Sequence, residues 1–220
     1  MTITENVRKL KRSIPPSVNI LAATKSQPIE NILEAIGAGI SSIGENYIQE
    51  AEEKFHLLKG DAELHCIGHL QTGKAAKAVR IFDMVQTVDS EKLAEAINKE
   101  SKKIWKIMPV LIEVNSAKEA GKTGVFPEQA EPLARKIAAM PHLFLKGLMT
   151  MGPFLKDAEK IRPYFRLTKH LFERLRSLNL QNTSIDILSM GMSGSFQVAI
   201  EEGATMVRIG TKIFGKGVFV

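Results

Sequence analysis

Lys25 is the residue whose type and position in the sequence point most directly to a chemical role. It follows the apolar run 18–24, in the segment AATKS. A lysine held at the end of a buried strand loses part of its hydration, which favours the neutral amine over the ammonium ion. Because a neutral amine attacks an aldehyde, we expect Lys25 to form an imine. Most lysines are solvated surface residues, and position alone leaves that alternative open.

Two glycine-containing segments near the end of the chain have the composition of an anion site. The first, SMGMSGS, includes Ser193 and Gly194, and the second, RIGT, spans 208–211. We expect Ser193 to open a helix, whose free N–H groups and hydroxyl would face an anion. Gly210 allows a ligand to approach the backbone closely, where the N–H groups of Gly210 and Thr211 can donate. An ordinary loop with turn glycines and a capping serine is the alternative.

The elements that must position these residues are short apolar runs alternating with stretches of helical spacing. Eight runs have the length and the β-branched, apolar content of buried parallel strands. They are 18–24, 40–43, 64–67, 82–88, 109–114, 143–149, 185–190 and 205–209. The segment 29–36 places its isoleucines and Leu33 at helical spacing, and Ser90 is suited to cap the helix that follows it. Further helices are expected over 126–140 and 157–178.

Strands that alternate with helices imply βαβ units and a parallel sheet. About eight such units without a break in composition predict a closed (β/α)₈ barrel, the TIM fold, rather than an open sheet. We expect residues 1–220 to form a single α/β domain, with a basic leading helix at about 1–14 that ends before Pro15 and Pro16.

A TIM barrel carries its site at the carboxyl ends of the strands, and its phosphate site commonly lies in the loops after strands seven and eight. Those loops contain the two glycine-containing segments. The same rule brings polar and sulfur-containing residues from the other strand ends to the mouth: Lys25, Glu45, Asn46, Tyr47, His69, Gln71, Met149 and Thr150.

Composition restricts the classes of protein to which the chain can belong. The net charge of +6 would suit a nucleic-acid binder, but the 30 basic residues are spread along the chain among 24 acidic ones, so we expect no nucleic-acid partner. No apolar run reaches the length of a membrane span, and the N-terminus lacks an apolar signal core. Cys66 is the single cysteine, so no intrachain disulfide can form. We expect a cytoplasmic protein without a membrane partner.

Two other motifs are weak candidates. The segment 68–74 fits the first seven positions of a P-loop, but Ala75 stands where the magnesium-binding Ser or Thr belongs. His65 and His69 are four residues apart, yet they flank a strand end instead of sharing a helix face, and no Glu follows His65. We therefore expect neither a nucleotide site nor a metal site.

The sequence resembles the pyridoxal phosphate homeostasis protein family, whose fold is similar to the N-terminal barrel of bacterial alanine racemases. The resemblance covers nearly the whole chain. The stretches that carry it include AATK, IGENYIQEAEEK, HCIGHLQ, TVDSEKLAEAIN, VLIEVN, KGLMTMGP and LSMGMSGSFQVAIEEGATMVRIGTKIFG. SMGMS followed by VRIGT at this spacing is highly specific.

The resemblance implies pyridoxal 5′-phosphate as cofactor, held as an imine on Lys25. The other cofactor-binding residues that it implies are Ser193, Gly194, Gly210 and Thr211 at the phosphate, Arg208 at the pyridine nitrogen, Asn46 and His69 along the cofactor face, and Met149 and Met192 beside the ring. Gln27 replaces a second lysine that is common in the family, and Gly73 replaces an asparagine, so a role of that second lysine in accepting cofactor does not carry over.

An arginine at the ring nitrogen disfavours its protonation and weakens the cofactor as an electron sink. Racemases of this fold add a tyrosine base from the partner subunit's extra β domain, and neither Tyr47 nor Tyr164 resembles it. The resemblance therefore implies a protein, expected to be monomeric, that buffers and delivers pyridoxal phosphate to apoenzymes without a catalytic residue of its own. The alternatives are a small racemase or other imine-forming enzyme, and an aldolase that uses Lys25 without a cofactor.

Overall fold

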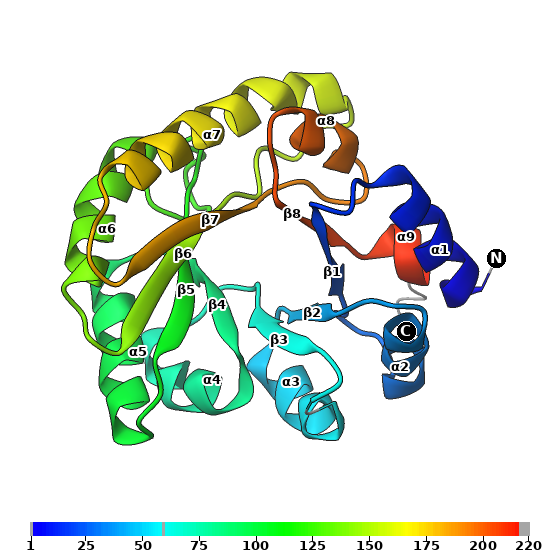
Figure 1. Cartoon of the computed structure of the whole chain (residues 1–220), viewed down its shortest axis with the longest axis horizontal. Coiled ribbons are helices and arrows are strands. Elements are labelled where there is room, and N and C mark those ends of the chain that lie inside the picture. Colours follow the sequence, from blue (N-terminus) through cyan, green and yellow to red (C-terminus); the bar gives the residue numbers. More distant parts are fainter. Residues whose placement is uncertain (1, 59, 216–220) are drawn as a thin grey trace.

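The computed structural model describes residues 2–58 and 60–215. Within these ranges eight parallel strands pair in chain order and close into a barrel (Figure 1). The strands are β1 (Asn19–Ala23), β2 (Ser42–Glu45), β3 (Glu63–Cys66), β4 (Met84–Val88), β5 (Met108–Glu113), β6 (Leu143–Met149), β7 (Thr183–Ser189) and β8 (Met206–Ile209). The predicted TIM barrel is confirmed, and both ends of each expected strand lie within two residues of the observed ends.

Helices cover the outside of the barrel (Figure 1). They are α1 (Ile3–Ser13), α2 (Ile29–Gly37), α3 (Ile48–Lys54), α4 (Ala75–Ile81), α5 (Glu91–Lys103), α6 (Ala130–Ala138), α7 (Arg162–Ser177), α8 (Phe196–Glu201) and α9 (Thr211–Phe214). Short 3₁₀ turns occur at η1 (Phe55–Leu57), η2 (Thr72–Lys74), η3 (Pro127–Gln129) and η4 (Ala158–Ile161). Ser90 caps α5, where its side chain accepts a hydrogen bond from the N–H of Leu93.

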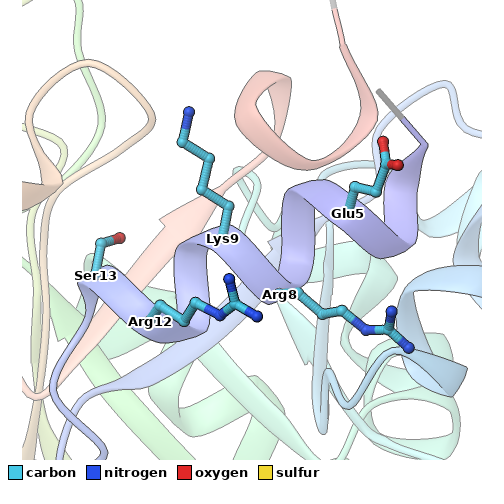
Figure 2. Close-up of a pocket in the computed structure, with 5 residues that line it drawn as sticks. All are labelled: Glu5, Arg8, Lys9, Arg12 and Ser13. Carbon is cyan, nitrogen blue, oxygen red and sulfur yellow. The ribbon is translucent and has the colours of Figure 1, made fainter.

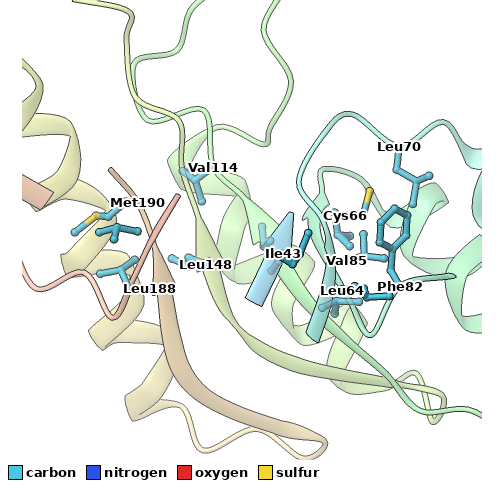
Figure 3. Packing of buried hydrophobic residues seen from close by; sticks show 14 of the residues in the cluster. Ile43, Leu64, Cys66, Leu70, Phe82, Val85, Val114, Leu148, Leu188 and Met190 are labelled. Carbon is cyan, nitrogen blue, oxygen red and sulfur yellow. The ribbon is translucent and has the colours of Figure 1, made fainter. Parts of the chain in front are cut away.

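The strands bury apolar residues on both faces, as the continuous apolar runs predict. The larger core lies between the strands and the helices, where Ile43, Leu64 and Val85 pack with residues of the helical layer (Figure 3). There the rings of Phe55 and Phe82 meet edge to face, with their centroids 5.8 Å apart. Two smaller clusters fill the barrel interior: Leu21, Ile67 and Met206 in one, and Met84, Leu111 and Met149 in the other.

The helix α1 lies beside α2 and the short α9, next to β1 and β8 in the ring (Figure 1). Its Val7 and Leu10 are buried, and the Asn6 side-chain amide donates to the carbonyl of Ile213 at 2.9 Å. Because α9 is only four residues long, α1 supplies the apolar cover that this side of the barrel otherwise lacks.

The outer face of α1 is strongly basic. Arg8, Lys9 and Arg12 line a shallow depression together with Glu5 and Ser13, all from this one helix (Figure 2). These charges point to solvent. Elsewhere, none of the helices in the described part of the chain is both long and apolar enough to cross a bilayer.

Candidate functional site

A cavity of about 570 Å³ opens at the carboxyl ends of the strands, where the TIM fold places its sites. Seven of the ten predicted site residues line it: Asn46, Met192, Ser193, Gly194, Arg208, Gly210 and Thr211. The rest of its wall comes from Ala23, Ile67, Ser195 and the segment after β6. The other three predicted residues, Lys25, His69 and Met149, do not line the cavity. The reason differs for each of them.

The loops after β7 and β8 form one corner of this cavity. Ser193 Oγ accepts a hydrogen bond from the backbone N–H of Lys212 at 3.3 Å, which brings the two loops together. Within the described ranges, the backbone N–H groups of Ser193, Gly194, Gly210 and Thr211 donate to no protein oxygen. Unpartnered N–H groups that converge in a concave site favour an anion.

The expectation that Ser193 opens a helix is wrong by three residues. The helix α8 begins at Phe196, and Ser195 is its N-cap. Residues 193–195 form a turn, because Ser195 and Phe196 both donate their N–H groups to the carbonyl of Met192. The N–H groups of Ser193 and Gly194 are therefore turn donors ahead of the helix instead of first-turn helix donors. They remain free to bind an anion.

Arg208 lies at the floor of the cavity with only 3% of its surface exposed. Its Nη1 donates to Ser189 Oγ at 2.7 Å, and its Nη2 donates to the carbonyl of Thr150 at 2.8 Å. Nη2 also lies 3.3 Å from the sulfur of Met151. Burial lowers the pKa of the Arg208 guanidinium to about 10, which still leaves it charged at neutral pH. The site therefore holds one fixed, largely desolvated positive charge.

Lys25 follows β1 as predicted, but its side chain is exposed in this structure. Its Nζ lies 5.4 Å from the ring centroid of Tyr47, in a cation–π contact at the rim of the mouth. The N–H of the next residue, Ser26, is fixed by Glu50 Oε2 at 2.9 Å. The expected desolvation of Lys25 is thus absent here. Its long, flexible side chain must turn from Tyr47 toward the cavity before the amine can meet a ligand there.

Asn46 reaches the cavity because its loop is tightly constrained. A Cβ atom at Gly68 would lie 2.2 Å from the carbonyl oxygen of Asn46, so only glycine allows the loops after β2 and β3 to pack together. Glu45 is fully buried and accepts the N–H of Asn46 at 2.7 Å and the hydroxyl of Thr24 at 3.2 Å. Burial raises the pKa of Glu45.

His69 follows β3 and has an exposed ring, whose Nδ1 lies 3.5 Å from Asp89 Oδ2. Close by, Glu113 at the end of β5 is 4% exposed and accepts from Thr123 Oγ1 at 2.8 Å. Its other oxygen has no hydrogen-bond partner in the described structure, and burial raises the pKa of this carboxyl. Glu113 and Thr123 line a second cavity of about 440 Å³ beside the first.

Met149 is fully buried in the barrel interior with Met84 and Leu111, below the cavity. It does not line the cavity, and its contact with a ligand stays a prediction. Met151, two residues further along and beyond the end of β6, lines the cavity instead.

The sequence reasoning also missed the apolar segment after β6, of which Pro153, Phe154 and Leu155 line the cavity. Phe154 is 90% exposed. A run of apolar residues directly after a barrel strand was the signal that could have identified this rim.

Residues 68–74 of the P-loop-like segment and both histidines are outside the lining of the cavity. Thr72–Lys74 of the P-loop-like segment form the 3₁₀ turn η2, and Gly68 serves the loop contact described above. His65 is 1% exposed and lies in the barrel interior, whereas His69 is at the mouth, so the two rings are not a pair. The described residues contain no cluster of three His, Cys, Asp or Glu side chains that could hold a metal ion.

Comparison with known proteins identifies the family. The sequence matches the model of the alanine racemase N-terminal domain over residues 1–217. The chain belongs to this family. Relatives include the pyridoxal phosphate homeostasis proteins of Vibrio alginolyticus, 41% identical over 210 residues, and of Escherichia coli, 35% identical over 205 residues. The first alignment covers 91% of this chain and 87% of the relative, and the second 91% and 86%. The predicted resemblance to the pyridoxal phosphate homeostasis proteins is confirmed.

Solved structures of family members agree with the barrel. PipY of Synechococcus elongatus, solved without pyridoxal phosphate, superposes with a TM-score of 0.91 at 31% identity, over 97% of this chain and all of PipY. PipY has also been solved with pyridoxal phosphate bound, with a TM-score of 0.89. An alanine racemase of Clostridium difficile gives a TM-score of 0.85 at 15% identity, and its match covers 99% of this chain and 57% of the racemase. That likeness shows the shared fold.

Proposed function

We propose that this protein binds pyridoxal 5′-phosphate at the barrel mouth, holds it as an imine on Lys25, and buffers and delivers it inside the cell. The observation that carries the proposal is the corner formed by Ser193, Gly194, Gly210 and Thr211, where free N–H groups converge in the same cavity as a buried arginine. The name of the curated relatives and the ligand of PipY support the same choice of cofactor.

The residues of the cavity fit the parts of this cofactor. The N–H groups of the corner and the Ser193 hydroxyl can bind a phosphate. Arg208 supplies a fixed donor and positive charge for the pyridine nitrogen, and Met192 and Ile67 offer apolar surface to a ring. When bound, pyridoxal phosphate supplies an aldehyde that condenses with a primary amine. Lys25 reaches the mouth from β1 once it leaves Tyr47.

Delivery follows from an open site with one covalent anchor. We propose that the bound cofactor is a weak electron sink, since the charged Arg208 disfavours a proton on the ring nitrogen. We also propose that no second residue assists carbanion chemistry. The imine on Lys25 then exchanges with water or with another amine, and the cofactor leaves for an apoenzyme. We also propose that the protein acts in the cytoplasm as a monomer, with pyridoxal-phosphate-dependent apoenzymes as its recipients.

Reduction and peptide mapping test the assignment. Borohydride treatment of the loaded protein should leave a pyridoxyl group on Lys25, and Lys25→Ala should lose the visible imine band. Lys156 is the sharp control, because it is the lysine that lines the cavity in this structure. Lys156→Ala should keep the band. A label on Lys156 in the wild type, or an undiminished band in Lys25→Ala, would refute the role of Lys25.

Delivery needs its own measurement. The loaded protein is mixed with an apoenzyme of known cofactor dependence, and the recovery of activity is followed against the same concentration of free pyridoxal phosphate. We expect transfer in the presence of a scavenger that captures free cofactor. If the scavenger abolishes transfer completely, the protein releases its cofactor to solution and acts as a buffer only.

A racemase or another imine-forming enzyme is the second candidate. One observation favours it: Tyr47 lies against Lys25 at the mouth, where a second base would have to act. Tyr164, the other tyrosine, is on α7 outside the barrel. An aldolase that uses Lys25 without a cofactor is separated from both by the absorption spectrum, because only bound pyridoxal phosphate gives a visible band.

A further inference from the structure

A line of hydrogen-bonded polar side chains crosses the interior of the barrel. From Arg208 Nη1 it passes to Ser189 Oγ over 2.7 Å, and from Ser189 Oγ to Gln86 Oε1 over 2.7 Å. Gln86 Nε2 lies 2.8 Å from His65 Nδ1, and His65 Nε2 lies 3.4 Å from Glu63 Oε2. We call these five residues the relay.

The relay connects the two ends of the barrel. Arg208 lines the cavity at the mouth, whereas Glu63 is the first residue of β3, at the opposite end, with a side chain 67% exposed. Between them Ser189 and Gln86 are fully buried, and His65 is 1% exposed. Two apolar clusters of the interior pack beside them, and in the described structure the side chains of Ser189 and His65 have hydrogen-bond partners only within the relay.

The chemistry of arginine fixes the direction of every bond. A guanidinium only donates, so Ser189 Oγ must accept from Arg208, and the Ser189 hydroxyl proton is left to donate to Gln86 Oε1. The amide nitrogen of Gln86 then faces His65 Nδ1, which must be an unprotonated acceptor. The His65 ring therefore carries its proton on Nε2, directed at the Glu63 carboxylate.

The opposite arrangement, with the His65 proton on Nδ1 and the Gln86 amide reversed, costs free energy. If His65 carried a proton on Nδ1, the Gln86 amide would have to turn over and present its nitrogen to Ser189. The Ser189 hydroxyl proton would then have no acceptor in a fully buried position, and the contact of Gln86 Nε2 with the sulfur of Met206 at 3.2 Å would be lost. The protein thus favours one orientation of the whole relay.

We propose that His65 and Gln86 are positioning residues, which act through Ser189 to hold the Arg208 guanidinium in place under the ligand cavity. This inference deepens the proposed function, and its link to the cofactor rests on that function. Neither His65 nor Gln86 lines the cavity, so neither touches a ligand there. Arg208 keeps its second anchor, the carbonyl of Thr150, when the relay is broken. We therefore expect the guanidinium to shift, and the protein to remain folded.

Charged side chains face His65 at the end of the relay. Glu63 on β3 is its direct partner. The charge of Lys146 on β6 also acts on Glu63, and Lys146 pairs with Asp186 on β7 at 2.7 Å. These three side chains lie at the end of the barrel opposite the cavity.

The first test needs no cofactor, and it uses a variant of the relay only to assign a resonance. ¹⁵N spectra of the imidazole groups in the ligand-free protein report which nitrogen of His65 carries the proton, with the resonance assigned by its loss in His65→Asn. We expect the Nε2–H form at pH 7. A proton on Nδ1 in the ligand-free protein would overturn the relay, whatever the protein binds.

The second test links the relay to the cavity. Gln86→Leu keeps the approximate size of the side chain and removes both of its hydrogen bonds within the relay. It should weaken pyridoxal phosphate binding about fivefold and move the absorption maximum of the bound cofactor. Thr168→Val is the matched control: Thr168 is fully buried on α7 and makes one hydrogen bond, to the carbonyl of Tyr164. It should leave affinity and absorption unchanged.

The double variant separates positioning from general destabilisation. Because Gln86 and Ser189 act in one chain, Gln86→Leu combined with Ser189→Ala should bind no more weakly than Ser189→Ala alone. Additive losses, or a spectrum of Gln86→Leu identical to that of the wild type, would refute the positioning role. If the wild type itself binds no pyridoxal phosphate, the proposed function fails, and the ¹⁵N result still decides the relay.

Discussion

Ser193 Oγ accepts the backbone N–H of Lys212 at 3.3 Å, and this hydrogen bond joins two loops that follow different strands. Ser193 belongs to the loop after β7, and Lys212 to the first turn of α9, after β8. The contact sets the spacing of the free N–H groups on both sides, so the anion corner is formed before a ligand arrives. Preorganised donors bind an anion without the entropic cost of ordering the loops.

The first prediction concerns the phosphate. Charge-assisted hydrogen bonds contribute about 1.5–3 kcal/mol each, so pyridoxal, which lacks the phosphate, should bind at least about a hundredfold more weakly than pyridoxal phosphate. Ser193→Ala should weaken pyridoxal phosphate by about 1–2 kcal/mol. Ser184→Ala, at the other end of β7, is the control. Titration followed by the imine band gives the affinities, and equal affinity for the two aldehydes would place the phosphate elsewhere.

The second prediction concerns catalysis. The loaded protein should racemise alanine no more than a small factor faster than free pyridoxal phosphate, as measured by chiral chromatography after long incubation. Turnover on the order of one per second or faster would establish the racemase instead. In that event Tyr47→Phe, which keeps the ring that Lys25 contacts and removes only its hydroxyl, should abolish the turnover and keep the imine band.

The third prediction concerns pH. Burial raises the pKa of Glu113 in the folded protein above its unfolded value of 4.5, so the folded state holds this proton more tightly. The resulting penalty is absent below about pH 4.5 and grows as the pH rises through the raised pKa. Glu113→Gln should therefore stabilise the protein at pH 7, and this advantage should shrink on acidification.

Urea denaturation at pH 7 and near pH 4.5 measures that difference. Glu53→Gln, which removes an exposed carboxylate of α3, is the control and should show no comparable pH-dependent gain. If Glu113→Gln destabilises the protein equally at both pH values, the neutral hydrogen bond from Thr123 outweighs the buried charge.

The fourth prediction concerns Cys66. Its side chain is 2% exposed, and burial raises the pKa of the thiol to about 12. Since the thiolate is the reactive form, alkylation of the native protein at pH 8 should be at least about a thousandfold slower than in urea. Iodoacetamide labelling followed by mass spectrometry measures both rates on this single cysteine. Rapid labelling of the native protein would mean that β3 opens readily.

The sequence alone determined the barrel and most of the mouth. Apolar runs at regular intervals can only be buried in a sheet covered on both faces, so their number and order predicted the eight strands. The rule that sites lie at the carboxyl ends of such strands then selected Arg208 and the loops around Ser193 and Gly210, all of which line the cavity. These features depend on local pattern and chain order, which a sequence contains.

Only the tertiary structure decided which side chains meet. Lys25 lies against Tyr47 at the rim, Met149 lies beneath the cavity while Met151 lines it, and the helix after β7 starts at Phe196. The relay from Arg208 to Glu63 joins strands that are far apart in sequence, and no local pattern predicts it. Such contacts depend on the closure of the barrel, which sets strand stagger and side-chain direction across its interior.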